Sequence, residues 1–209
     1  MNSVFGIIFV LVILIVSIIL HEIAHGVAAL FFGDDTAKRA GRLTLNPIPH
    51  IDPIGSILLP LMGLLLGGFI FGWAKPVPYN PANFKRNPRL GLFAVAIGGV
   101  ATNFILAVFA ALSVRTLVSF GQVELAELMV PMVILNIFLG IFNLIPIPPM
   151  DGSKVLYAIF NVSSWQQQQI EMRIGGFTGF FIIIMLMMFG FFRPVFAFAY
   201  SVAQWLLLA

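Results

Sequence analysis

Six long apolar runs limit this chain to one class of fold. They cover residues 4–32, 54–73, 90–118, 130–145, 176–192 and 195–208 of the 209-residue sequence. A helix needs roughly 20 apolar residues to cross a bilayer. Only 9% of the residues are charged, whereas soluble domains contain about 25%. We therefore expect an all-α polytopic membrane protein that forms a single membrane-embedded domain over residues 1–209, without a sizeable soluble part.

The run at residues 54–73 differs from the others because glycine and proline interrupt it. The interrupting residues are Pro53, Gly55, Pro60, Gly63, Gly67, Gly68 and Gly72. Irregular backbone is tolerated at membrane depth only where protein or water satisfies its polar groups. The expected fold is thus about five transmembrane helices plus this segment, which is re-entrant, a hairpin or a full crossing. Short β-strands near the functional site are a further option.

Basic residues flank that segment on both sides, and their distribution bears on its topology. Cations cluster at residues 38–42 and again at residues 75–89, whereas residues 119–127 contain two glutamates and no cation. Cytoplasmic loops are enriched in Lys and Arg. Both basic loops are therefore cytoplasmic if the segment is re-entrant, but lie on opposite faces if it crosses. The net charge of +3 is accordingly explained by orientation in the membrane and not by nucleic-acid binding.

The strongest chemical signal is His21-Glu22-Ile23-Ala24-His25, at the end of the first run. On a helix, residues i and i+4 share a face with Cβ atoms about 5–6 Å apart, so two such histidines can bind one zinc ion. The glutamate is then placed to take a proton from water, as in H-E-x-x-H metalloproteases. The alternative is a buried polar cluster that only helps helices pack. Ionisable residues inside an apolar span are unfavourable and usually functional, which argues against it.

A third zinc ligand is needed, because catalytic zinc normally has three protein ligands. The chain contains no cysteine. Asp151 is the preferred ligand because it follows the proline-rich residues 143–150, where irregular backbone at membrane depth indicates a cavity. A plain turn that ends one helix and caps the next is the alternative. The other candidates are His50, Asp34, Asp35, Asp52, Glu124, Glu127 and Glu171.

Two of those candidates have a simpler interpretation. Asp52 is expected to cap a helix that starts at Pro53, and His50 is expected to be an exposed loop residue.

The three preferred ligands can meet only if the first run and the run at residues 130–145 end at the same depth on the same side. This requires residues 54–73 to return to the side from which they enter, in agreement with the charge pattern. The site then lies towards the cytoplasmic side, with the N-terminus outside. The last two runs form a C-terminal helical hairpin at residues 165–209.

Two intramembrane amides are candidates for a supporting role. Asn103 lies beside a small-residue face formed by Ala94, Gly98 and Thr102. It is expected either to support a neighbouring group or substrate carbonyl, or to hold helices together. Asn143 opens the proline-rich segment before the third ligand and is the stronger candidate for a functional role.

Together these motifs resemble a known family. HEIAH, GGVATN and NLIPIPPMDG, in this order on three runs, resemble the site-2 proteases, which are intramembrane zinc metalloproteases. The chain looks most like the minimal bacterial members, without PDZ or CBS domains. The resemblance covers residues 10–154. Two details depart from the family pattern: the third-span motif lacks the proline of G-P-x-x-N, and Ser153 replaces the second glycine of L-D-G-G.

The resemblance implies a set of roles. His21, His25 and Asp151 would bind one Zn²⁺, Glu22 would be the catalytic base, and Asn143 would assist substrate binding. The implied activity is hydrolysis of a peptide bond in a transmembrane substrate, within a multi-pass protein of a bacterial cell membrane.

The catalytic core is expected at residues 4–154. A helical substrate must unwind before cleavage, and strand pairing along residues 69–75 would hold it. The alternative function is a membrane zinc transporter or a non-proteolytic metal-binding scaffold. The oligomeric state is left open by the sequence.

Overall fold

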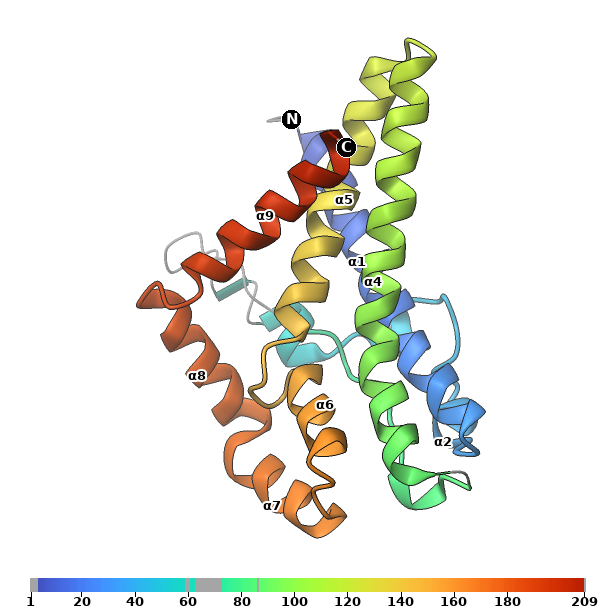
Figure 1. The fold of residues 1–209 in the computed structure, drawn as a ribbon, viewed down its shortest axis with the longest axis vertical. Helices are drawn as coiled ribbons and strands as arrows, with labels where there is room; N and C mark the ends of the chain where they lie inside the picture. Colours follow the sequence, from blue (N-terminus) through green and yellow to red (C-terminus); the bar gives the residue numbers. More distant parts are fainter. Residues whose placement is uncertain (1–3, 59–60, 63–72, 86, 209) are drawn as a thin grey trace.

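The chain forms a bundle of helices in the computed structural model, which describes residues 4–58, 61–62, 73–85 and 87–208 (Figure 1). Three long helices organise it, namely α1 (Val4–Phe31), α4 (Pro88–Ser119) and α5 (Val123–Asn143). The others are α2 (Thr36–Arg39), η1 (Ile48–His50), η2 (Pro53–Leu58), η3 (Pro81–Asn83), α6 (Asp151–Ile159), α7 (Ser164–Ile174), α8 (Gly176–Met188) and α9 (Arg193–Leu208). Each of the three long helices is long and apolar enough to cross a membrane. The prediction of an all-helical membrane protein is thus confirmed, and the described residues contain no β-strand.

The surface and the interior of the bundle have the polarity expected in lipid. One side of α1 is apolar and 45–54% exposed, at Ile8, Leu11, Val12, Ile15 and Val16. The other side buries Ser17, His21 and His25. Apolar surface left in water is unfavourable by about 25 cal/mol per Å², whereas lipid solvates it. The interior is therefore where this chain places its polar groups.

The central helix is α4, which packs against α1, α5 and α6. Its 32 residues span about 48 Å at a rise of 1.5 Å per residue, which exceeds the roughly 30 Å of a hydrocarbon core. A Cβ on Gly98 would lie only 3.2 Å from the carbonyl oxygen of Ala24. The predicted small-residue face of α4 is therefore where α1 approaches closely.

The C-terminal part differs from the two separate spans that we expected. Helices α8 and α9 meet at an angle of 84°. Because α8 has 13 residues, or about 20 Å, it is too short to cross a membrane alone. Together the two helices lead from α7 towards the end of the molecule where α1 begins (Figure 1). The described helices thus supply three spans, or four if this bent pair is one span, and the expected number of about five is not confirmed.

The described ends of the glycine- and proline-rich run lie side by side, while most of its interior lies outside the described residues. The Trp73 amide donates a hydrogen bond to the Gly55 carbonyl over 3.1 Å. The Ser56 hydroxyl donates to the Trp73 carbonyl over 2.8 Å. The predicted cap is confirmed, since Oδ1 of Asp52 accepts from the amides of Ile54 and Gly55.

A buried carboxylate joins the end of α1 to the loop before α4. Asp34 is 0% exposed and accepts hydrogen bonds from the Asn80 amide (2.7 Å), the Asn83 side chain (2.8 Å) and the Thr36 amide (3.1 Å). Burial alone would raise the pKa of the Asp34 carboxyl, but these hydrogen bonds hold that pKa below its ordinary value of 3.8. Asp34, one of the alternative candidates for a metal ligand, therefore stabilises the turn that follows α1 and its contact with the loop before α4.

Replacing Asp34 by Asn is expected to lower the stability of the fold at neutral pH. The NH₂ of the new side chain would face N–H groups that donate to the carboxylate in the wild type. An unsatisfied buried polar group costs about 1–3 kcal/mol. The lowered pKa also means that the carboxylate stabilises the wild type fully above the unfolded pKa of about 3.9, and less as the pH falls below it. Thermal unfolding in detergent at several pH values measures both effects. Asp35→Asn is the matched control, since Asp35 pairs with Arg39 at the surface. Equal shifts for the two variants would contradict this role.

Candidate metal centre

One helical turn of α1 places His21 and His25 side by side, facing the interior. Each residue is 6% exposed, and the ring centroids lie 4.5 Å apart. The Nε2 atoms are 3.0 Å apart. The i, i+4 spacing accounts for this arrangement, so the predicted shared face is present.

Asp151 reaches this pair from the first residue of α6. The turns of residues 144–150 carry the chain from the end of α5 into α6. The Oδ2 atom of Asp151 lies 3.2 Å from Nε2 of His21 and 3.2 Å from Nε2 of His25. Its Oδ1 atom accepts a hydrogen bond from Nζ of Lys154 over 3.2 Å. The structure thus brings together the three residues that the sequence singled out as metal ligands.

The far side of each imidazole is hydrogen bonded, and this determines where the ring carries its proton. Nδ1 of His25 lies 2.6 Å from the Val95 carbonyl oxygen. A carbonyl can only accept, so Nδ1 is the donor and Nε2 of the neutral ring keeps its lone pair. Nδ1 of His21 lies 2.6 Å from Oδ1 of Asn103, with the same consequence. Both histidines therefore point a lone pair towards Asp151.

Three lone-pair atoms consequently form a triangle with sides of 3.0, 3.2 and 3.2 Å. In a tetrahedral zinc site with bonds of about 2.0–2.1 Å, ligand atoms are about 3.3–3.4 Å apart. The Asp151 Oδ2 atom is buried and has no hydrogen-bond donor among the described residues. Such a group of acceptors is unfavourable unless a cation lies between them. The donor set therefore fits a zinc ion.

Glu22 lies next to this triangle. Ligand atoms of Glu22, His21 and His25 all lie within 4.8 Å of one another. The Oε2 atom of Glu22 accepts a hydrogen bond from the Val77 amide over 2.7 Å, which orients the carboxylate. A carboxylate at this position is suited to exchange protons with a water molecule at the metal.

The segment that orients Glu22 is itself held by its neighbours. The Lys75 amide donates to the His50 carbonyl over 2.9 Å, and Nη2 of Arg42 donates to the Lys75 carbonyl over 2.6 Å. His50 is 3% exposed, and its Nε2 lies 2.9 Å from the Thr44 carbonyl oxygen. The prediction that His50 is exposed is therefore wrong, because this loop uses the histidine to satisfy its own backbone.

The two predicted amides have different surroundings. Asn103 is 0% exposed and contacts His21 directly. Nδ2 of Asn143 donates to the Leu139 carbonyl over 3.0 Å, within its own helix. The described contacts do not join Asn143 to the triangle, so its part in substrate binding stays a prediction.

Sequence reasoning missed three groups that complete the site. The Val95 carbonyl leaves no signal in a sequence, because every residue has one. Gly99 packs against the rings, since a Cβ there would lie 2.5 Å from Nε2 of His25. Lys154 follows Asp151 by three residues on α6, and that helical spacing is a signal that could have found it.

Comparison with known proteins agrees with this geometry. Residues 118–187 match a family model described as Peptidase family M50. The chain is 41% identical over 155 residues to YwhC of Bacillus subtilis, in an alignment that covers 71% of this chain and 67% of that protein. The chain belongs to peptidase family M50, the site-2 proteases. The resemblance inferred from the motifs is thereby confirmed.

Two other relatives of this M50 protein are more distant. Rip2 of Mycolicibacterium smegmatis is 28% identical over 182 residues, which cover 86% of this chain and 67% of Rip2. MJ0392 of Methanocaldococcus jannaschii is 29% identical over 164 residues, which cover 77% of this chain and 36% of MJ0392. The names of all three relatives contain the words zinc metalloprotease. No solved structure matches the chain. The M50 protein described here is a zinc metalloprotease.

Substituting Gly99 by Ala is expected to weaken zinc binding at least tenfold, because the new Cβ would lie 2.5 Å from Nε2 of His25 and 2.6 Å from Cε1 of His21. Displaced imidazoles no longer match the spacing that zinc requires. Competition of the purified M50 protease with a zinc chelator measures the change. The control is Gly98→Ala, whose Cβ meets the Ala24 carbonyl at 3.2 Å and neither imidazole among its nearest contacts. Unchanged zinc affinity in Gly99→Ala would show that the rings do not hold the metal.

Proposed function

We propose that this M50 protease is an intramembrane endopeptidase that hydrolyses a peptide bond of a transmembrane substrate near the cytoplasmic face. His21, His25 and Asp151 would hold Zn²⁺, and Glu22 would be the general base. The supporting observation is the triangle of lone-pair atoms, with sides of 3.0–3.2 Å, next to a carboxylate. Zinc bound there would polarise the scissile carbonyl and lower the pKa of a water molecule to about 7.

Glu22 would accept the proton of the attacking water and pass it to the leaving amine. The Val77 amide already donates to Oε2 of Glu22, which leaves Oε1 to carry the proton. A carboxylate fixed in this way loses little orientational freedom when the substrate arrives, which favours a proton transfer that depends on geometry.

The depth of the site supports a substrate that lies in the membrane. The apolar stretch of α1 runs from Ile8 to Phe31. His21 lies 13 residues after its start, or about 20 Å along the helix, so the histidines lie inside this stretch. A peptide bond that reaches them must enter the membrane-embedded part of the protein.

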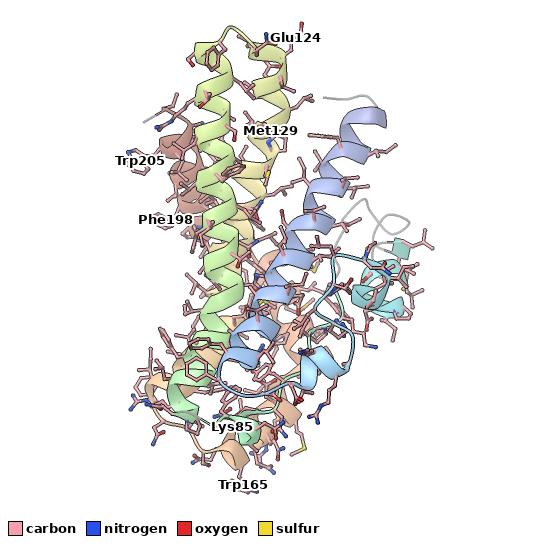
Figure 2. The ribbon with its side chains drawn as sticks, turned by 90° about the vertical axis from the view of Figure 1, so that its right-hand side faces the viewer. Lys85, Glu124, Met129, Trp165, Phe198 and Trp205 are labelled. Carbon is pink, nitrogen blue, oxygen red and sulfur yellow. The ribbon has the colours of Figure 1, made fainter. Side chains whose placement is uncertain are left out.

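The distribution of charge supports a cytoplasmic position. Figure 2 shows Lys85 and Glu124 at opposite ends of the molecule. The hydrogen bonds from the Trp73 amide to the Gly55 carbonyl and from Arg42 to the Lys75 carbonyl support a common side for both basic loops. By the positive-inside rule that side is cytoplasmic, and the start of α1 is then outside.

The hydrogen bonds of residues 73–77 support a way to hold an unwound substrate. The Trp73 amide bonds to Gly55. The backbone groups of Lys75 bond to His50 and Arg42. The Val77 amide bonds to Glu22. Consecutive residues of an extended chain point their backbone groups to opposite edges, so residues 73, 75 and 77 would share one edge. The opposite edge, at Ala74, would pair with a substrate strand in the peptide-recognition mode known as β-augmentation. The remainder of the predicted edge, residues 69–72, lies outside the described residues.

Glu22→Gln is expected to lower kcat by about 10²- to 10⁴-fold, the usual contribution of a general base, while zinc stays bound. The assay is cleavage of a synthetic transmembrane peptide by the purified protease in detergent, with metal content measured on the same samples. His21→Ala is the companion variant, and it is expected to lose both zinc and cleavage.

Two outcomes would contradict the proposal. Equal cleavage by wild type and Glu22→Gln would exclude this base. Zinc bound without cleavage in any sample would favour the transporter or scaffold alternative.

Lys154→Met is expected to weaken zinc binding by about 10- to 100-fold, the usual effect of removing a group that orients a metal ligand. Lys154 contacts Oδ1 of Asp151 at 3.2 Å and thereby turns Oδ2 towards the histidines. Chelator competition measures the zinc affinity, and Lys154→Arg is expected to restore part of it. Lys38→Met, at an exposed position on α2, is the matched control. Equal affinities in both Met variants would exclude this role of Lys154.

A further inference from the structure

Behind His21 lies a continuous chain of hydrogen bonds that crosses three helices. It consists of Asn103 on α4, Asn136 on α5 and Ser17 on α1, which are 0%, 0% and 1% exposed. Amides inside a membrane protein are commonly explained as contacts that hold helices together. In this chain, however, the order of donors and acceptors also determines how each amide is oriented and which ring nitrogen of His21 carries the proton.

The direction of the chain is set at one end by a backbone carbonyl. The Met132 carbonyl oxygen lies 2.9 Å from the side chain of Asn136. Since a carbonyl can only accept, the amide NH₂ of Asn136 must face it. The same NH₂ donates to the Ser17 hydroxyl over 2.9 Å. The Oδ1 atom of Asn136 is therefore the side that faces Asn103.

From this point each orientation follows from the one before. Oδ1 of Asn136 accepts a hydrogen bond from Nδ2 of Asn103 over 3.0 Å, so Oδ1 of Asn103 faces His21. That oxygen lies 2.6 Å from Nδ1 of His21 and requires Nδ1 to be the donor. In the neutral ring the lone pair is then on Nε2, where the metal site lies. With the Asn103 amide reversed, its NH₂ would face Nδ1, and the ring proton would be on Nε2.

We infer that Asn136 is a positioning residue for the metal centre. Acting through Asn103, it fixes the tautomer of His21 that leaves Nε2 free to bind the metal. The inference rests on the proposed role of His21 as a zinc ligand.

The other two histidines provide internal references for this inference. Nδ1 of His25 faces the Val95 carbonyl directly, so His25 holds the Nδ1–H tautomer without a relay. Nε2 of His50 faces the Thr44 carbonyl, so His50 holds the opposite tautomer. A change at Asn136 that acts through the relay must alter His21 and leave both references unchanged.

The experiment is nitrogen NMR of the metal-free protein with ¹⁵N-labelled histidine rings, at a pH where the rings are neutral, because ring-nitrogen shifts separate the two neutral tautomers from each other and from the doubly protonated ring. In the wild type, His21 and His25 are expected to be protonated on Nδ1 and His50 on Nε2. Asn136→Leu removes the acceptor that fixes the Asn103 amide. A fraction of His21 is then expected to become protonated on Nε2, and the zinc Kd to rise by about 10- to 100-fold.

Three further variants separate the relay from packing. Asn136→Asp keeps an acceptor for Asn103, and as a neutral buried acid it can donate to Ser17, so it is expected to behave like the wild type. Thr102→Val, next to Asn103, removes a hydrogen bond to the Gly98 carbonyl outside the relay and is expected to change neither readout. Asn103→Asp combined with Asn136→Leu is expected to restore the Nδ1–H tautomer, because the hydrogen bond from the imidazole N–H favours the charged carboxylate at position 103, and either of its oxygens can then accept from His21.

Several results would overturn the inference. One is a wild-type His21 protonated on Nε2, which can be observed even if Asn136→Leu does not fold. Another is an Asn136→Leu variant with unchanged His21 shifts and zinc affinity, and a third is an Asn136→Asp variant as impaired as Asn136→Leu. His21→Ala separates the two levels of the argument. If it leaves zinc binding intact, the proposed metal ligand fails, whereas loss of zinc in His21→Ala with no effect of Asn136→Leu rejects only the relay.

Discussion

Three electron-rich atoms face one another across 3.0–3.2 Å in the interior of this protein, and the surrounding structure holds them there. In a medium of low dielectric constant their mutual repulsion is scarcely screened. Each of the three side chains is held by a hydrogen bond on the side away from the others. Val95 and Asn103 orient the two imidazoles, and Lys154 holds the carboxylate. A divalent cation bound between these atoms would replace the repulsion by attraction to all three.

The bilayer explains how so small a chain can concentrate polar groups in its interior. The outward sides of its helices carry Ile, Leu, Val and Phe, and Figure 2 shows Phe198 and Trp205 projecting from the outside of α9. Lipid supplies the apolar environment that a soluble protein has to build for itself. The interior is therefore free to contain amides, imidazoles and carboxylates, provided that each finds a partner.

The sequence predicts which polar side chains meet in the interior better than it predicts the groups that support them. Helical spacing was sufficient to join His21, Glu22 and His25, and the proline-rich segment pointed to Asp151. The relay to Asn136 could not be derived, because it depends on how α1, α4 and α5 are rotated about their axes. Apolar content gave the long helices correctly. It could not show the bend between α8 and α9, where Gly190 has a φ of +73°, a conformation that glycine adopts at little energetic cost. The burial of His50 likewise follows from backbone partners that composition does not reveal.

Both histidines project from α1, whereas the groups that orient them, the Val95 carbonyl and the Asn103 amide, belong to α4. Each of these hydrogen bonds is 2.6 Å long, and a hydrogen bond is lost once its atoms are more than about 3.5 Å apart. Sliding α1 along α4 by a fraction of a helical turn would therefore break both hydrogen bonds. By thermodynamic linkage, a metal that prefers one helix register must also stabilise that register. Zinc bound by both histidines would therefore stabilise the alignment of α1 and α4, in addition to its part in the proposed reaction.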